Sequence, residues 1–142
     1  MSSTADLILA APGDIETIVA SDYALGKFKG VSVDGLDPLK LAALHWVLVH
    51  KALKDILPEY HPVAQASPEG PWLVSLPDEL IASLGKIAPT EHASLAAKWA
   101  STKQAQEAGW SEQDAEGFLG RLVPFAQTAA FEGKALFLWV YD

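Results

Sequence analysis

The chain has 142 residues and no cysteine, and its eighteen acidic residues outnumber its ten lysines and arginines to give a net charge of −8. This length fits one domain with a single core, and the absence of cysteine excludes disulfides, thiolate nucleophiles and cysteine-ligated metal centres. The acidic balance, without a basic stripe, argues against nucleic acid and an anionic membrane surface as partners.

The N-terminus lacks the charged segment of a signal peptide, because the first basic residue is Lys27. No apolar run is long enough to span a bilayer, so we expect a soluble, cytoplasmic protein. Counted with glycine in place of tyrosine, apolar residues reach about 55% of the chain, above the 45–50% typical of soluble domains. This excess predicts a large core or a subunit interface, and we favour a homodimer.

The first third of the chain predicts a strand, a short helix and a connector. Residues 1–5 are small and polar and are expected to be frayed, whereas residues 6–10 have the composition of a short strand. The Pro12-Gly13-Asp14 sequence then opens a short helix with apolar positions at helical spacing. Residues 22–36 contain three glycines and predict a connector with one turn of helix.

Asp37-Pro38 is a strong signal for the start of a helix, because aspartate caps free backbone N–H groups and proline is tolerated at the first helical position. The helix is predicted to continue to about Leu57 and to end at Pro58. Apolar residues occupy most sides of its middle, so we expect it to be the central core helix, covered all round by its neighbours.

The second half predicts one irregular loop, two strands and three helices. Residues 58–71 hold four prolines and predict the loop, and residues 72–76 predict a strand that leads into a helix starting at residues 77–79. The next helix is expected to be capped by Thr90. A Ser111–Asp114 capping box opens the last helix, which Pro124 should kink or split and Gly133 should end. Residues 135–141 predict the final strand.

These elements predict a single α+β domain over residues 1–142, with a small, mostly antiparallel sheet packed against several helices. The layout, with the stretches WLVSLPDELIASLGKIAPTEHASLAAKW and FLGRLVPFAQTAAFEGKALFLWVYD and the Asp37–Lys40–Leu44-His45 group, resembles the YfbM-like family of uncharacterised bacterial proteins. The resemblance implies an α+β fold and implies no activity.

Three residues are the candidates for a binding site. His45 lies on the apolar side of the central helix, where an imidazole is either a core residue with a backbone partner or a tuned base. His92 lies in the first turn of its helix, in the same stripe as Trp99. The three side chains would border a cleft beside the central helix, although core packing accounts for each of them as well.

Other motifs point to no catalytic chemistry. His45 and His50 are five residues apart and cannot share a metal on one helix face, so we expect no metal and no cofactor. No serine has the glycine-flanked turn of a nucleophile elbow. The paired carboxylates lie at helix N-termini, where the backbone dipoles favour negative charge.

Two hypotheses for the function follow, and neither names a catalytic residue. The first is a non-enzymatic protein-interaction module that binds itself or a basic protein, and it rests on the charge, the apolar excess and the lack of a catalytic constellation. The alternative is a small-molecule binding protein or small enzyme with a cleft near the central helix, lined by His45, His92 and Trp99. The position of His45, sealed in the core or open to a cavity, distinguishes the two.

Overall fold

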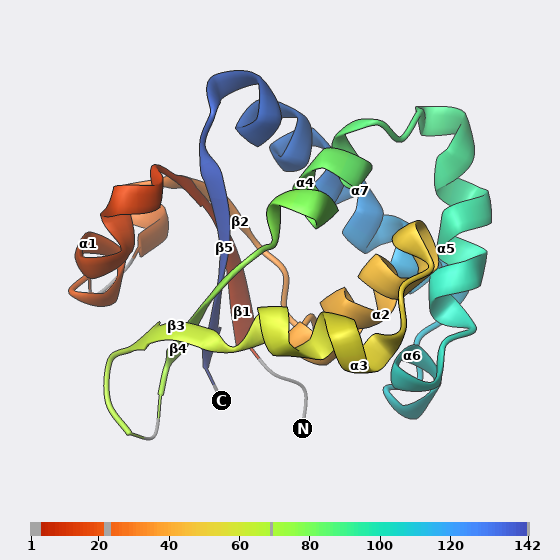
Figure 1. The fold of residues 1–142 in the computed structure, drawn as a ribbon, viewed down its shortest axis with the longest axis horizontal. Helices are drawn as coiled ribbons and strands as arrows, with labels where there is room; N and C mark the ends of the chain where they lie inside the picture. The colour runs from red at the N-terminus through yellow and green to blue at the C-terminus, as the bar shows by residue number, and fades with distance from the viewer. Residues whose placement is uncertain (1–3, 22–23, 69, 142) are drawn as a thin grey trace.

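The computed structural model describes residues 4–21, 24–68 and 70–141. Within these ranges the chain forms a five-stranded sheet in the order β2-β1-β5-β4-β3, with every neighbouring pair antiparallel (Figure 1). The prediction of an α+β fold with a small antiparallel sheet is therefore confirmed. The strands are β1 (Thr4–Ala10), β2 (Lys29–Ser32), β3 (Pro62–Gln65), β4 (Trp72–Ser75) and β5 (Ala135–Tyr141).

The two ends of the chain pair at the centre of the sheet. β1 and β5 are in register over their full lengths, from Thr4 opposite Tyr141 to Ala10 opposite Ala135. Thr4 and Ala5 thus belong to a central strand, so the expectation that residues 1–5 are frayed is wrong for these two, and residues 1–3 lie outside the described part. Pairing with β5 supplies backbone partners that a polar start does not reveal.

The edge strands β2 and β3 fall where the sequence predicted a connector and a loop. Each has four residues, mostly with exposed or half-buried side chains, so neither shows the apolar pattern of a buried strand. β3 even begins with Pro62, which is tolerated at the first residue of an edge strand. Tertiary pairing, rather than local composition, makes these segments strands.

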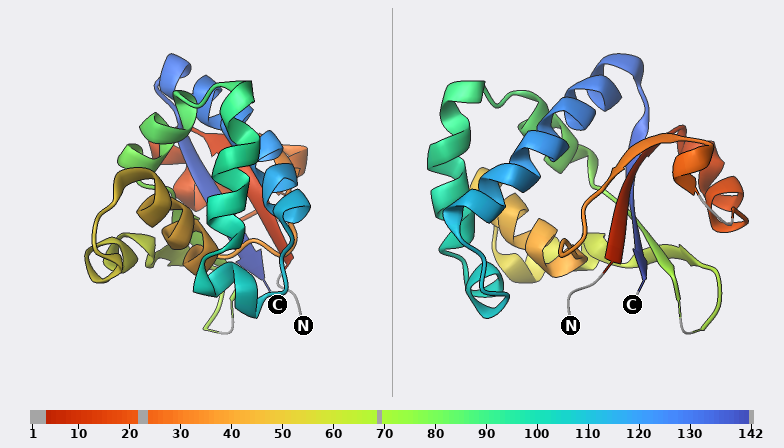
Figure 2. Two further views of the ribbon diagram at one scale, coloured as in Figure 1. Left: turned by 90° about the vertical axis from the view of Figure 1, so that its right-hand side faces the viewer. Right: turned by 180° about the vertical axis from the view of Figure 1, so that it is seen from behind.

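The helices cover the two faces of the sheet unequally. Four of them, α2, α4, α5 and α7, pack on one face and enclose the larger core, whereas α1 covers part of the other face (Figures 1 and 2). The α-helices are α1 (Ile15–Val19), α2 (Pro38–Val49), α3 (Leu53–Ile56), α4 (Asp78–Gly85), α5 (His92–Ala100), α6 (Lys103–Glu107) and α7 (Glu112–Glu132). Short 3-10 turns are η1 (Pro12–Asp14), η2 (Ala24–Gly26), η3 (Leu57–Tyr60) and η4 (Pro89–Glu91).

The central helix is shorter than predicted. α2 begins after the Asp37 cap, as expected, but it ends at Val49 because His50 adopts a left-handed conformation with φ 57°. The chain then turns back, and α3 and η3 bring Ile56 and Tyr60 into the core beside α2. A continuous helix would have carried these side chains away at 1.5 Å per residue and left them exposed. The prediction that the middle of α2 is covered all round is confirmed for the six of its twelve residues that are buried and is wrong for Trp46, which is 47% exposed.

Two details of the later helices differ from the prediction. Thr90 does not cap α5; instead the turn η4 precedes it, and the Ala88 N–H donates to the Glu91 carboxylate at 2.9 Å. Pro124 does not split α7, which is continuous over 21 residues. Pro124 lies on the exposed side, so the bond that the proline removes leaves a carbonyl that water can reach. The Ser111 cap and the Gly133 end are as predicted.

Candidate functional site

His45 is sealed in the core by bonds to both of its ring nitrogens. Its side chain has 0% exposure. Nδ1 lies 3.0 Å from the Tyr60 hydroxyl, and Nε2 lies 2.7 Å from Oε1 of Glu79. Because an ionised carboxylate can only accept, Nε2–H donates to Glu79, and Nδ1 of a neutral ring accepts the Tyr60 proton. No nitrogen of this ring is left to act on a ligand.

The His45 network continues to the surface through Glu79. The Lys51 ammonium lies 2.9 Å from the same Oε1 atom, and the hydrogen bonds from Lys51 and then His45 hold the pKa of Glu79 below its usual value. Burial raises the pKa of Tyr60, with smaller contributions from neighbouring carboxylates, so its hydroxyl stays a donor. The network therefore joins α2, η3 and α4 and explains why a histidine occupies the core.

The other two predicted residues are not joined to His45 in a common cleft. Trp99 is fully buried on α5; its Nε1–H donates to the Lys40 carbonyl at 2.9 Å, and its ring lies edge-on to Trp110. His92 begins α5, and its Nε2 is buried without a hydrogen-bond partner in the described part of the chain. The predicted site residues are thus dispersed. His45 and Trp99 have structural partners, whereas His92 does not within the described part of the chain.

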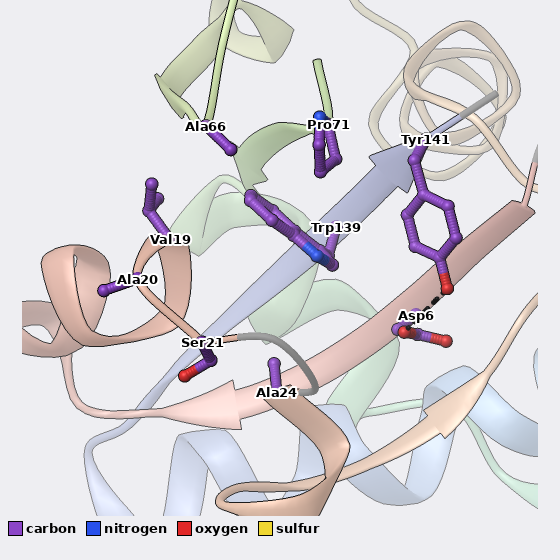
Figure 3. Close-up of a pocket in the computed structure, with 9 residues that line it drawn as sticks. All are labelled: Asp6, Val19, Ala20, Ser21, Ala24, Ala66, Pro71, Trp139 and Tyr141. Carbon is purple, nitrogen blue, oxygen red and sulfur yellow. Dashed lines mark hydrogen bonds between the residues drawn. The ribbon is translucent and has the colours of Figure 1, made fainter.

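A pocket lies instead on the sheet face that α1 covers only in part. It has a volume of ≈ 430 Å³ and opens beside the ends of β1 and β5 (Figure 3). Asp6 and Trp139 are paired across β1 and β5, and Tyr141 follows on the same face as Trp139, so register brings one carboxylate and two aromatic rings together. The remaining lining residues are Val19, Ala20, Ser21, Ala24, Ala66 and Pro71.

Asp6 is the unusual group of this pocket, named here the Asp6 pocket. Its side chain is only 6% exposed, and within the described ranges its carboxylate accepts a hydrogen bond from the Tyr141 hydroxyl, 3.4 Å from Oδ2 (Figure 3). Burial is the main cause that raises the pKa of Asp6; the Tyr141 bond lowers it, and the charge of Asp34 raises it further. Among the described residues that line the pocket there is no lysine, arginine or histidine.

Sequence reasoning missed this pocket because Asp6 and Trp139 are at opposite ends of the chain. The available signal was a lone carboxylate in an apolar strand, since Asp6 precedes four consecutive apolar residues in β1. A charged side chain that points to a buried face is costly unless it is paired. The residue that shares its face could be named only once the register of β1 against β5 was known.

No cluster of three or more histidine, aspartate or glutamate side chains in the described ranges could hold a metal ion. Among the helices within those ranges, none combines the length and apolar character needed to cross a membrane. Comparison with protein-family models, with curated proteins and with solved structures finds no match to the chain. The resemblance to the YfbM-like family therefore stays a prediction, and the function must be argued from the geometry.

Proposed function

We propose that this protein is a non-enzymatic protein-interaction module that binds a basic partner, and that the Asp6 pocket receives a lysine or arginine side chain of that partner. The observation that carries the proposal is the Asp6 carboxylate, which is buried at the edge of an open pocket whose described lining residues include no cation. An ionised group in this position lowers the stability of the fold, and perturbed groups of this kind are concentrated at functional sites.

The pocket has the chemistry of a cation site. A protonated amine or guanidinium would form a charge-assisted hydrogen bond with Asp6, and the ring of Trp139 offers a face for a cation–π contact. The net charge of −8 adds a long-range attraction for a basic protein and repels an acidic one. Binding would also relieve the burial cost of the carboxylate, because the bound cation favours its ionised form.

The environment of His45 supports a non-enzymatic role. This histidine was the strongest sequence candidate for acid–base catalysis, and both of its nitrogens are engaged by Tyr60 and Glu79 in a fully buried position. A general base must come within hydrogen-bond reach of the proton that it removes. His45 is therefore a structural residue of the core in this proposal and does not take part in binding.

The proposal is tested with small probes that isolate the cation. N-acetyl-lysine-methylamide and its arginine counterpart are titrated into the protein, and the Trp139 indole N–H is followed by NMR. We expect a saturable shift with a dissociation constant on the order of 1 mM, as suits a single ion pair with one aromatic contact. The norleucine analogue, which has the same apolar chain without the charge, should give no shift.

Asp6→Asn should abolish the shift, whereas the matched variant Asp55→Asn, at an exposed position of α3, removes one negative charge elsewhere and should keep it. The affinity should also increase as the pH rises through the raised pKa of Asp6, because the carboxylate must be ionised to bind. Equal binding by the Asp6→Asn variant and the wild-type protein would exclude this pocket as the cation site.

A further inference from the structure

A second cavity lies on the opposite side of the molecule from α1, along the exposed side of α2. Trp46 is 47% exposed there, although α2 is otherwise largely buried. Together with Ala43 and Leu53, Trp46 forms the apolar wall of a groove of ≈ 510 Å³. We name it the Trp46 groove. Its volume is within the range of small-molecule sites, about 300–1,000 Å³.

The rim of the Trp46 groove is positive. Lys98, at the end of α5, and Lys103, at the start of α6, both line it, and none of the other described lining residues is acidic. In the described part of the chain no carboxylate lies within ion-pair distance of Lys98, and Lys103 has only the exposed Glu107 at 3.9 Å. The groove thus combines two lysines with an apolar wall, in a chain whose net charge is −8.

The hydroxyl groups of the groove are already engaged. The Thr102 hydroxyl donates to the Trp99 carbonyl and caps α6 by accepting from the Ala105 N–H, and the Ser101 hydroxyl donates to the Lys98 carbonyl. The apolar wall, the two ammonium groups and the side-chain amide of Gln104 therefore remain for recognition, and only the ammonium groups carry charge. That combination suits a molecule with a long apolar part and one anionic end.

We propose that the Trp46 groove binds a free single-chain amphiphile with a carboxylate head, of the fatty-acid class. The chain lies against Ala43, Trp46 and Leu53, and the head lies between the ammonium groups of Lys98 and Lys103. The lysines select an anionic head over a neutral or cationic one.

A second copy of the chain is a less suitable occupant. A two-fold interface buries the same surface patch on both copies, so a dimer formed through this groove would bring the lysines of both copies into one contact region. Like charges brought together in this way oppose association. The positive rim therefore favours a small anionic ligand, and this inference is independent of the Asp6 pocket.

The test uses four probes, each at a concentration where it is dissolved as a monomer: dodecanoate, dodecanol, dodecyltrimethylammonium and butyrate. Isothermal titration should give one dodecanoate per chain, with at least tenfold weaker binding of each of the other three. A bromine-substituted dodecanoate should quench tryptophan fluorescence in the wild-type protein. It should quench much less in Trp46→Phe, which keeps an apolar ring but removes the reporting indole.

The decisive variant is the double substitution Lys98→Ser/Lys103→Ser. Its control is Lys54→Ser/Lys86→Ser, which also removes two positive charges but at exposed positions outside the groove. We expect the first pair to weaken dodecanoate binding at least tenfold and the second to leave it within twofold. Equal losses in both pairs would mean that only the net charge matters and would overturn the proposal.

The last measurement is the oligomeric state, which distinguishes a ligand groove from an interface between two copies of the chain. Light scattering across a concentration series should give the same mass for the wild-type protein and Trp46→Ala, with and without dodecanoate. If the wild-type protein is instead a dimer that Trp46→Ala or dodecanoate separates into monomers, the groove is an interface between copies and the fatty-acid assignment is wrong. Binding only to vesicles of an anionic phospholipid, and not to free dodecanoate, would overturn it as well.

Discussion

Replacing His45 by asparagine should destabilise the protein strongly without affecting cation binding by the molecules that remain folded. The imidazole is fully buried and bridges Tyr60 and Glu79, at 3.0 and 2.7 Å. Asparagine is too short to reach both partners, so the change removes both bonds at once. This prediction distinguishes a core histidine from one that acts on a ligand.

The magnitude follows from what each partner loses. A buried donor such as the Tyr60 hydroxyl costs about 1–3 kcal/mol when it is left unsatisfied, and the truncated ring leaves a cavity in the core. Glu79 is partly exposed and keeps its bond to Lys51, so it adds little to this cost. We expect a total of about 3–4 kcal/mol, a large part of the 5–15 kcal/mol typical of a folded domain.

The assay is urea denaturation followed by tryptophan fluorescence, with thermal unfolding as a second measurement. His45→Asn should lower the urea midpoint with an unchanged slope, and the melting temperature should fall by about 10–15 °C. Tyr60→Phe removes only one of the two bonds and should cost about 1–2 kcal/mol. In the double variant the two effects should overlap by about 1 kcal/mol, because they share the 3.0 Å contact.

The structural role of His45 would be refuted if the free energy of unfolding of His45→Asn were within about 0.5 kcal/mol of the wild-type value, which is the range of surface substitutions. A variant that was stable but failed to shift the Trp139 indole N–H in the lysine titration would assign His45 to binding. Additive effects in the double variant would show that the imidazole and the Tyr60 hydroxyl do not interact.

Three further predictions follow. Burial raises the pKa of Asp6, so the folded state holds that proton more tightly and stability falls as the pH rises through the raised pKa; Asp6→Asn should raise the urea midpoint at pH 7. Hydrogen bonds, that from Lys51 first, lower the pKa of Glu79, so its contribution is complete above the ordinary value of 4.5 and is lost as the pH falls through the lowered one. In Glu79→Gln the urea midpoint should therefore fall less at acidic pH than it does in the wild-type protein. Gly30→Ala should cost about 2–3 kcal/mol by urea denaturation, because its Cβ would lie 2.3 Å from the Leu7 carbonyl oxygen.

The sequence predicted those elements whose ends carry their own chemical signals. Asp37 and Ser111 accept backbone N–H groups at the starts of α2 and α7, and Gly133 ends α7 in a left-handed conformation. These signals are local, because each cap bonds to a residue three or four positions away. The length of α2 was overestimated because no residue near His50 signals its left-handed conformation in the sequence.

Long-range pairing decided what the sequence could not predict. β2 is a strand because it hydrogen-bonds to β1, and the burial of Tyr60 depends on the turn that returns the chain to α2. The partners of His45 show the same limit. An imidazole on an apolar helix face predicts a need for partners, but Glu79 is 34 residues away and looked like an ordinary acidic residue at a helix start.

The two cavities differ in what the fold itself requires of their charged residues. Lys98 and Lys103 are exposed, so they cost the folded state little, and only ligand binding can reveal a role for them. Asp6 is buried in a central strand, where asparagine would occupy nearly the same volume without the burial cost of a charge. If Asp6→Asn is both more stable and unable to bind a cation, the carboxylate is present at the expense of the fold, which is the relation expected of a binding residue. If the variant is less stable, Asp6 has a structural partner and the pocket loses its main support as a site.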